Sequence, residues 1–171
     1  MTYGLPVVIT RASNNYGPRA YLEKVIPLFI TNLMDGQKIP VYGAGKQIRD
    51  WLFVEDHCAG ILLLIKKGIN GEVYNIGGGQ ECTNIRLTRR VLKLMGKGED
   101  SIDFVQDRPG HDFRYSLNCA KLKKLGWSPA YDLEQGLGKT ICWYQENQDS
   151  WRPLKEKMDK RYVTGYWGAK K

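Results

Sequence analysis

Two stretches of the chain concentrate polar side chains of the kind that bind ligands. Asn14 and Asn15 follow an apolar run, within Ser13-Asn-Asn-Tyr-Gly-Pro18, and Arg108 and His111 flank a Pro-Gly turn in a polar loop. Amides donate and accept hydrogen bonds, and guanidinium and imidazolium groups donate to phosphate oxygens. We therefore expect a binding role for all four. The alternatives are an Asx turn for the asparagines and a purely structural turn for the arginine and histidine.

Two further cations stand at positions suited to phosphate. Lys24 lies at the start of a predicted helix, where its ammonium group is well placed to bind phosphate. The alternative is a solvated surface lysine. Arg49 lies inside a predicted strand, where its planar guanidinium suits phosphate oxygens. An internal ion pair with Asp50 or Glu55 is the alternative for Arg49.

Apolar and glycine-rich segments supply surfaces for a flat ligand. Pro40, Val41 and Tyr42 are expected to form an extended edge on which a pyrimidine can lie, unless they form an ordinary core strand. Asn75 stands in a strand before the triplet Gly77-Gly-Gly79, and glycines let a ligand approach the backbone closely. The triplet lacks the G-x-G-x-x-G spacing of a dinucleotide site, so we interpret it as a flexible loop.

Composition narrows the class of protein. The 171 residues include 26 Lys and Arg against 18 Asp and Glu, for a net charge of +8, and 42% are hydrophobic. These values indicate one globular domain. We expect neither a membrane-spanning segment nor a signal peptide, and we find no RNA-binding motif. The four cysteines form no C-x-x-C pair, so we expect no metal site, and we expect the thiols to be reduced in a cytoplasmic protein.

The elements that position these residues alternate between short strands and helices, which predicts an α/β fold. Residues 5–10 are apolar on both faces, as in a strand buried within a parallel sheet. Hydrophobic spacing predicts further strands at 40–42, 47–53, 72–77 and 102–105, and helices at 25–34, 59–67, 85–95, 119–125 and 133–148. We divide the chain into a binding domain, residues 1–148, and a basic aromatic tail without periodicity, residues 149–171.

Seven motifs in a fixed order resemble the carboxyl-terminal half of the dTDP-glucose 4,6-dehydratases, which are extended short-chain dehydrogenases/reductases. The resemblance covers about residues 2–148. Its motifs are Ser13-Asn-Asn-Tyr-Gly-Pro18, Glu23-Lys24-x-Ile-Pro27, Pro40-Val-Tyr-Gly-x-Gly45, Gln47-Ile-Arg-Asp-Trp-Leu-x-Val-Glu-Asp-His57, Tyr74-Asn-Ile-Gly-Gly78, Asp107-Arg-Pro-Gly-His-Asp112 and Leu125-Gly-Trp127.

The resemblance implies a function and a set of site residues. Enzymes of this family use NAD to convert a nucleotide-diphosphate sugar into a 4-keto-6-deoxy sugar. The resemblance places Asn15 near the nicotinamide. It implies substrate contacts for ten residues: Asn14 on the hexose, Lys24 and Val25 at the diphosphate and base, Pro40, Val41 and Tyr42 at the pyrimidine, Arg49, Arg108 and His111 at the phosphates, and Asn75 at a part of the substrate that is not specified.

The family's Rossmann-type half and its catalytic Tyr-x-x-x-Lys couple have no counterpart in these 171 residues. That couple needs a helix, so that both side chains share one face. Two stretches match only by spacing: Tyr42 to Lys46 contains two glycines, and Tyr166 to Lys170 lies in the tail. We therefore assign no catalytic residue, and we expect the chain alone to bind substrate without turning it over.

The sequence leaves several alternatives open. A UDP- or CDP-sugar dehydratase or a nucleotide-sugar 4-epimerase would share many of these motifs. A module that binds nucleotide diphosphates without chemistry would also need the same contacts. The resemblance implies a homodimer for the intact enzyme. The strand at 5–10 expects parallel neighbours, so an exposed sheet edge could also mediate association.

Overall fold

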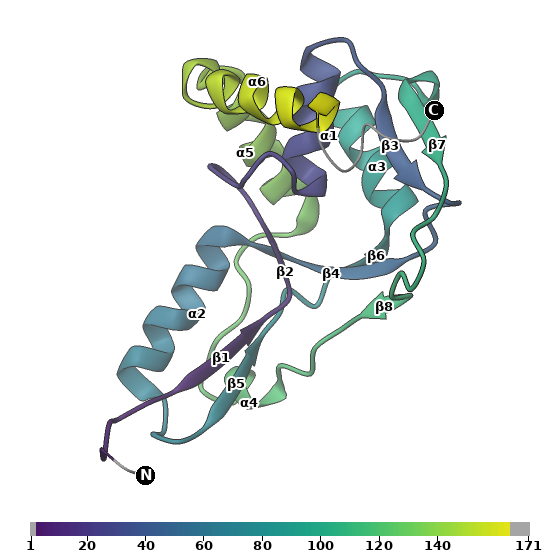
Figure 1. Cartoon of the computed structure of the whole chain (residues 1–171). Coiled ribbons are helices and arrows are strands. Elements are labelled where there is room, and N and C mark those ends of the chain that lie inside the picture. The colour runs from purple at the N-terminus through teal and green to yellow at the C-terminus, as the bar shows by residue number, and fades with distance from the viewer. Residues whose placement is uncertain (1–2, 165–171) are drawn as a thin grey trace.

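The computed structural model describes residues 3–164, and Figure 1 shows two lobes joined by a central group of strands. The lobe at the lower left holds β1, β5, α2 and α4. The upper lobe holds α1, α3, α5, α6 and the pair β3 and β7. Among the described helices, none combines the length and hydropathy needed to cross a bilayer.

The lower lobe is built on a two-stranded parallel sheet. β1 (Ile9–Ala12) pairs with β5 (Val73–Ile76), and α2 (Val54–Lys67) and α4 (Ala120–Lys123) pack beside it. Its small core contains Leu52, Leu64, Tyr74, Ile76, Leu122 and Trp127.

The predicted buried strand at 5–10 is wrong in its bounds and its burial. β1 begins at Ile9, where pairing with Val73 starts, and all four of its residues are exposed. Leu5 and Val7, which the prediction placed in the strand, are also exposed. Within the described residues β1 has one strand neighbour, β5, so the apolar run has no second strand to bury it.

The central strand β4 (Ile48–Phe53) connects the two lobes. It pairs with β2 (Asn14–Tyr16) and β8 (Arg114–Tyr115) in parallel and with β6 (Glu81–Thr83) antiparallel. β4 leads without a loop into α2, which begins at Val54 rather than at the predicted Ala59. The earlier start brings Glu55 and Asp56 into the first turn, where negative charge favours a helix.

The upper lobe packs three helices around a second parallel pair, β3 (Ile39–Tyr42) and β7 (Ile102–Val105). The helices are α1 (Val25–Met34), α3 (Asn84–Leu94) and α5 (Leu133–Glu146), with the short 3-10 helix η1 (Glu99–Ser101) before β7. Thr83 caps α3, and Asp132 with Gln135 forms a capping box on α5. Most of the predicted elements are confirmed here, within a few residues at each end.

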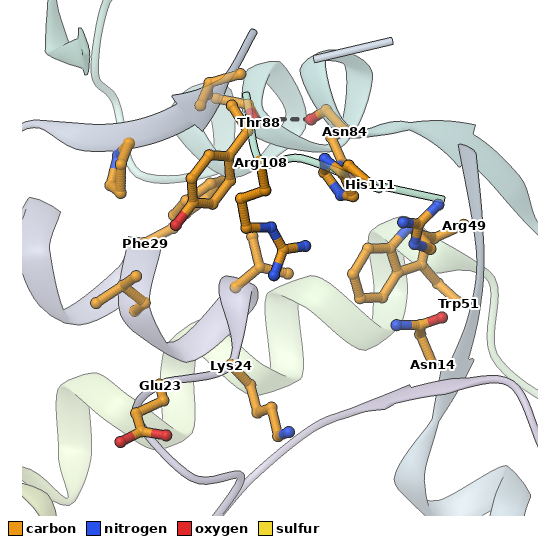
Figure 2. Close-up of a pocket in the computed structure, with 15 residues that line it drawn as sticks. Asn14, Glu23, Lys24, Phe29, Arg49, Trp51, Asn84, Thr88, Arg108 and His111 are labelled. Atoms are coloured by element: carbon orange, nitrogen blue, oxygen red, sulfur yellow. Dashed lines mark hydrogen bonds between the residues drawn. The ribbon is translucent and has the colours of Figure 1, made fainter. Parts of the chain in front are cut away.

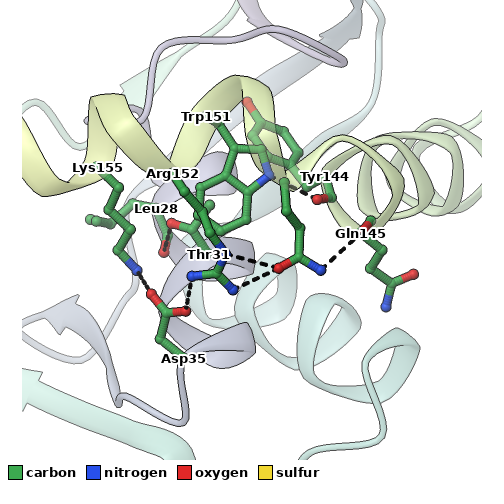
Figure 3. Close-up of polar contacts among 9 residues, drawn as sticks. Leu28, Thr31, Asp35, Tyr144, Gln145, Trp151, Arg152 and Lys155 are labelled. Atoms are coloured by element: carbon green, nitrogen blue, oxygen red, sulfur yellow. Dashed lines mark hydrogen bonds and ion pairs between the residues drawn. The ribbon is translucent and has the colours of Figure 1, made fainter.

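Residues 148–164 of the predicted tail form a helix and not an irregular segment. α6 (Gln148–Thr164) buries Trp151, whose Nε1 donates to the Tyr144 carbonyl at 2.8 Å. Figure 3 shows Lys155 and Arg152 on the Asp35 carboxylate, at 2.6 and 3.0 Å. Trp151 and Lys155 are four residues apart and are both buried, as on one face of a helix. The sequence did not reveal this pattern, because lysine is normally a surface residue. The second Tyr-x-x-x-Lys match, at 166–170, lies outside the described residues.

Two glycines of α5 predict opposite effects of one substitution. A Cβ at Gly136 would lie 2.1 Å from Tyr16 Oη, whereas a Cβ at Gly138 would meet nothing within 4 Å. We expect Gly136→Ala to lower the free energy of unfolding by about 1–3 kcal/mol, because the aromatic ring must move. Gly138→Ala should raise it by about 0.5–1 kcal/mol, because alanine is the better helix former. Urea denaturation measures both, and equal shifts would contradict this packing.

Candidate functional site

A cavity of about 540 Å³ opens where α1, α3, β3, β4 and the loop after β7 meet, as Figure 2 shows. Nine of the eleven residues predicted to bind substrate or cofactor line it: Asn14, Lys24, Val25, Pro40, Val41, Tyr42, Arg49, Arg108 and His111. These residues come from distant parts of the chain. The structure therefore brings together a set that was expected to share one ligand.

Secondary structure sets the direction of each wall. Lys24 is the residue before the first turn of α1, and Val25 opens that helix, so the helix N-terminus borders the cavity. β3 ends beside it with Pro40 and Tyr42 half-buried. Asn14 on β2 pairs in register with Trp51 on β4, so an amide and an indole ring form the opposite wall.

The cavity carries more positive than negative charge. Lys24, Arg49 and Arg108 line it, and no carboxylate among the described residues lies within ion-pair distance of any of them. Glu23 is the single acidic side chain in the lining. Uncompensated cations in a recess attract anions, and phosphate oxygens accept hydrogen bonds from all of these donors.

Arg49 is held by backbone carbonyl groups and not by a carboxylate. Its guanidinium donates to the Ile48 carbonyl at 2.7 Å and the Asp112 carbonyl at 2.9 Å, and it lies over the Tyr115 ring at 4.4 Å from the centroid. The alternative of an ion pair with Asp50 or Glu55 is therefore wrong. Arg49 joins the loop that ends at residue 113 to β4, and it also lines the cavity.

Asp107 organises the polar loop that carries Arg108 and His111. Its carboxylate accepts from Gln47 Nε2 at 2.6 Å and from the Arg108 amide at 2.8 Å, and it lies 2.6 Å from His111 Nδ1. The hydrogen bond with His111 holds the pKa of the Asp107 carboxyl below its ordinary value, against an opposing contribution from burial. The Arg108 guanidinium lies over the Tyr42 ring, 5.0 Å from its centroid.

Glu81 on β6 anchors the far end of the same loop. Arg114 donates two hydrogen bonds of 2.8 Å to its carboxylate, and the Ser116 hydroxyl donates a third. These contacts, with Arg114 foremost, lower the pKa of the Glu81 carboxyl to about 2. Tyr115 donates to Asp112 within the same segment, and this bond raises the pKa of the Tyr115 phenol.

Two predicted site residues lie outside the main cavity. Asn15 alternates with Asn14 along β2 and lines a second recess, of about 530 Å³, with its amide donating to the Ser13 carbonyl at 3.0 Å. Asn75 lies on β5, which pairs with β1 in the lower lobe, and it does not line the main cavity, so its substrate contact stays a prediction. The amide of Asn75 donates to the Asn118 carbonyl at 3.0 Å.

The prediction missed six residues that line the cavity: Glu23, Leu28, Phe29, Trp51, Asn84 and Thr88. Strand alternation could have found Trp51, since it lies two residues after Arg49 on the same strand. Asn84 opens α3, and Thr88 lies one turn further on and donates to the Asn84 carbonyl at 2.8 Å. Leu28 and Phe29 fit a helix core, so their spacing alone gave no sign of a cavity.

Known proteins share this architecture. The family model for GDP-mannose 4,6 dehydratase matches residues 1–140. The chain belongs to this family. Among curated relatives, the dTDP-glucose 4,6-dehydratase of Streptomyces niveus is 54% identical over 155 residues, which are 90% of this chain and 46% of the relative. That of Neisseria meningitidis is 48% identical over 163 residues. The chain thus spans about half the length of the curated relatives it matches.

Solved structures confirm the predicted fold class. The dTDP-glucose 4,6-dehydratase of Bacillus anthracis in complex with NAD is 50% identical and superposes with a TM-score of 0.85, over 90% of this chain and 49% of that one. The Streptomyces venezuelae enzyme, solved with NAD and TYD bound, is 49% identical and superposes with a TM-score of 0.86. UDP-glucose 4-epimerase of Thermotoga maritima is 30% identical and superposes with a TM-score of 0.80, over 85% of this chain and 48% of that one.

The Glu81 anchor predicts a stability difference that depends on pH. The native pKa of Glu81, about 2, lies below the ordinary value of 4.5, so its contribution is complete above pH 4.5 and is lost as pH falls toward 2. We expect Glu81→Gln to lower the melting temperature at pH 7, and the gap to wild type to narrow between pH 5 and pH 3. Glu99→Gln, which removes the exposed pair with Arg89, is the control and should shift melting less. A gap that does not change with pH would contradict the anchor.

Proposed function

We propose that this chain supplies the nucleotide-sugar-binding part of a dTDP-glucose 4,6-dehydratase, with residues 1–148 as the substrate domain. The observation that carries the proposal is the convergence of nine predicted residues, three of them unpaired cations, on one cavity. Identities near 50% to several dTDP-glucose 4,6-dehydratases support it. The whole protein would then be an NAD-dependent lyase.

Each wall of the cavity suits one part of the substrate. The half-buried edge of Pro40 and Tyr42, with Val41 between them, offers apolar surface and main-chain groups to the pyrimidine. Lys24, Val25, Arg49, Arg108 and His111 would surround the diphosphate. Asn14 at the start of β2 would then orient the hexose. Asn75 does not line this cavity, and we assign its substrate contact to no particular part of the ligand.

The reaction needs NAD, which accepts a hydride from the sugar and later returns it. Of the residues described, we assign the contact with the nicotinamide to Asn15. It is exposed on the opposite side of β2 from Asn14 and borders the second recess. Its amide already donates to the Ser13 carbonyl, which leaves its side-chain oxygen to accept a hydrogen bond. The chain itself therefore binds and orients the sugar nucleotide, and it contributes no proton-transfer group that we assign.

The alternatives differ from this proposal in the base and in the chemistry. A 4-epimerase shares the fold at 30% identity, so the fold alone does not separate the two activities. The higher identity to dTDP-glucose 4,6-dehydratases favours the dehydratase. A module that only binds a nucleotide diphosphate would keep the cavity and lack turnover even in the full-length protein.

We also propose a homodimer for the intact enzyme and a cytoplasmic location. The four cysteines, all within the described residues, are free, which suits a reducing compartment. β1 is exposed and has one strand neighbour among the described residues, so this edge could associate with another copy when the chain is isolated.

The proposal predicts a selective loss of affinity when Arg108 is truncated. A charge-assisted hydrogen bond is worth roughly 1.5–3 kcal/mol, so Arg108→Ala should weaken dTDP-glucose binding by about tenfold or more. Its melting temperature should stay close to wild type because the side chain is exposed. Arg89→Ala, outside the cavity, is the control for lost positive charge. Calorimetric titration measures the affinities, and an affinity equal to wild type would remove Arg108 from the site.

Arg49→Ala should instead lower both affinity and melting temperature. The guanidinium lines the cavity and also holds the Asp112 carbonyl, so its loss affects binding and the attachment of the loop to β4. Titration and thermal melts on the same preparation separate the two effects. A stability loss with wild-type affinity would assign Arg49 a purely structural role.

Base selectivity tests the dehydratase against the alternatives. We expect the chain to bind dTDP-glucose at least about tenfold more tightly than UDP-glucose or CDP-glucose, in competition titrations. Equal or reversed preference would favour a UDP- or CDP-sugar enzyme. The full-length protein, supplied with NAD and dTDP-glucose, should form a 4-keto-6-deoxy product, and binding without product would favour the module.

A further inference from the structure

The side chain of Asp107 is exposed and does not line the cavity. It accepts three hydrogen bonds, from a side chain before β4, a backbone amide and an imidazole ring, and two of them come from the turn that carries the candidate phosphate ligands. The turn itself is closed by the His111 amide donating to the Arg108 carbonyl at 3.2 Å, with Gly110 at φ +67°. Asp107 therefore grips both ends of this turn.

Asp107 pairs with His111 and leaves Arg108 unpaired. Arg108 is the neighbouring residue, yet its guanidinium lies over Tyr42 in the cavity and has no ion pair within the described part of the chain. The negative charge is thus directed to the imidazole, and the cation stays available to a ligand. Gln47, a buried residue, donates to the second carboxylate oxygen and fixes the orientation of the group.

The contact also decides which ring nitrogen of His111 meets the ligand. An ionised carboxylate only accepts hydrogen bonds, so Nδ1 of His111 must carry a hydrogen toward Asp107. Nε2 has no hydrogen-bond partner among the described residues, and the ring lines the cavity. In the neutral ring Nε2 holds a lone pair, which repels a phosphate oxygen. In the protonated ring Nε2 donates to it.

We propose that Asp107 is a positioning residue that orients the Arg108–His111 turn and couples diphosphate binding to a proton on His111. The inference rests on the proposed function, since it assumes a nucleoside-diphosphate ligand. Binding would place His111 between two anions, Asp107 at Nδ1 and the diphosphate at Nε2. A proton from solvent then adds to Nε2, and this hydrogen bond to the phosphate forms as the ligand enters.

The negative charge of the diphosphate favours a proton on the ring more in the complex than in the empty cavity. Asp107 hydrogen-bonds to the ring, Tyr42 on β3 packs edge-on against it, and Arg108 lies over Tyr42. The other charged and titratable groups of this region, Asp112, Arg49 on β4 and Tyr115 on β8, contact one another. Two of these groups are arginines and two are carboxylates, so their formal charges balance when no ligand is bound. The diphosphate offsets both arginines, and so the proton becomes favourable in the complex.

Calorimetric titration with dTDP-glucose between pH 6.5 and 8.5, in buffers of different ionisation enthalpy, measures both affinity and proton uptake. The diphosphate of dTDP-glucose is esterified at both ends and does not titrate in this range. We expect wild type to take up a fraction of a proton and to bind several-fold more weakly at pH 8.5 than at pH 6.5. On binding, Asp107→Asn should take up a smaller fraction of a proton than wild type. Its affinity should fall about fivefold or more at pH 8.5 and less at pH 6.5.

Two further variants separate positioning from structure. Asp103→Asn removes an exposed carboxylate on β7 and should match wild type at every pH. His111→Gln keeps an amide donor but cannot titrate, so its affinity should not depend on pH, whatever the stability of Asp107→Asn. Equal proton uptake in wild type and Asp107→Asn, or a loss of affinity that is the same at every pH, would overturn the proposal.

The same titrations distinguish failure of this inference from failure of the proposed function. Wild-type chain that binds dTDP-glucose without proton uptake would overturn the coupling and leave the proposed function intact. Wild-type chain that binds no dTDP-glucose at any pH would overturn both.

Discussion

The hydrogen-bonded ladder along β4 is the constraint on which the site depends. Its six residues pair with three other strands, from before it, after it and near the end of the loop that carries Arg108 and His111. A strand that is bound on both edges has little freedom to move. Arg49 and Trp51 therefore hold fixed positions in the cavity wall, and β2 and β8 are positioned by their pairing with β4.

The loop between β7 and α4 is attached in a different way from the rest of the site. It contributes little to the two hydrophobic cores and is held by Asp107, by the carbonyl contacts of Arg49 and by the Arg114–Glu81 pair. The Arg114–Glu81 pair is a surface contact and is individually weak, whereas Gln47 and Arg49 make their contacts from buried side chains. The binding groups on this loop thus depend on electrostatics, whereas those on β2, β3, β4 and α1 depend on packing.

Local patterns predicted most of the elements because hydrophobic periodicity reports burial directly. They failed where a distant segment decides the outcome. The bounds of β1 are set by its register with β5, and α6 was missed because Lys155 is buried against Asp35, 120 residues away. The motifs predicted nine residues of the cavity. The contacts of Asp107 were not predicted, because its hydrogen bond to Gln47 joins residues 60 positions apart.

The buried ammonium group of Lys155 gives α6 a chemical marker. Its side chain is only 5% exposed and faces Asp35, so the folded state shields this amine from reagents that label lysines. The neighbouring Lys157 is exposed and would react at once. The rate at which Lys155 is labelled therefore reports how often α6 leaves the end of α1, the helix whose other end borders the cavity. A surface reagent can follow the docking of this helix without any ligand present.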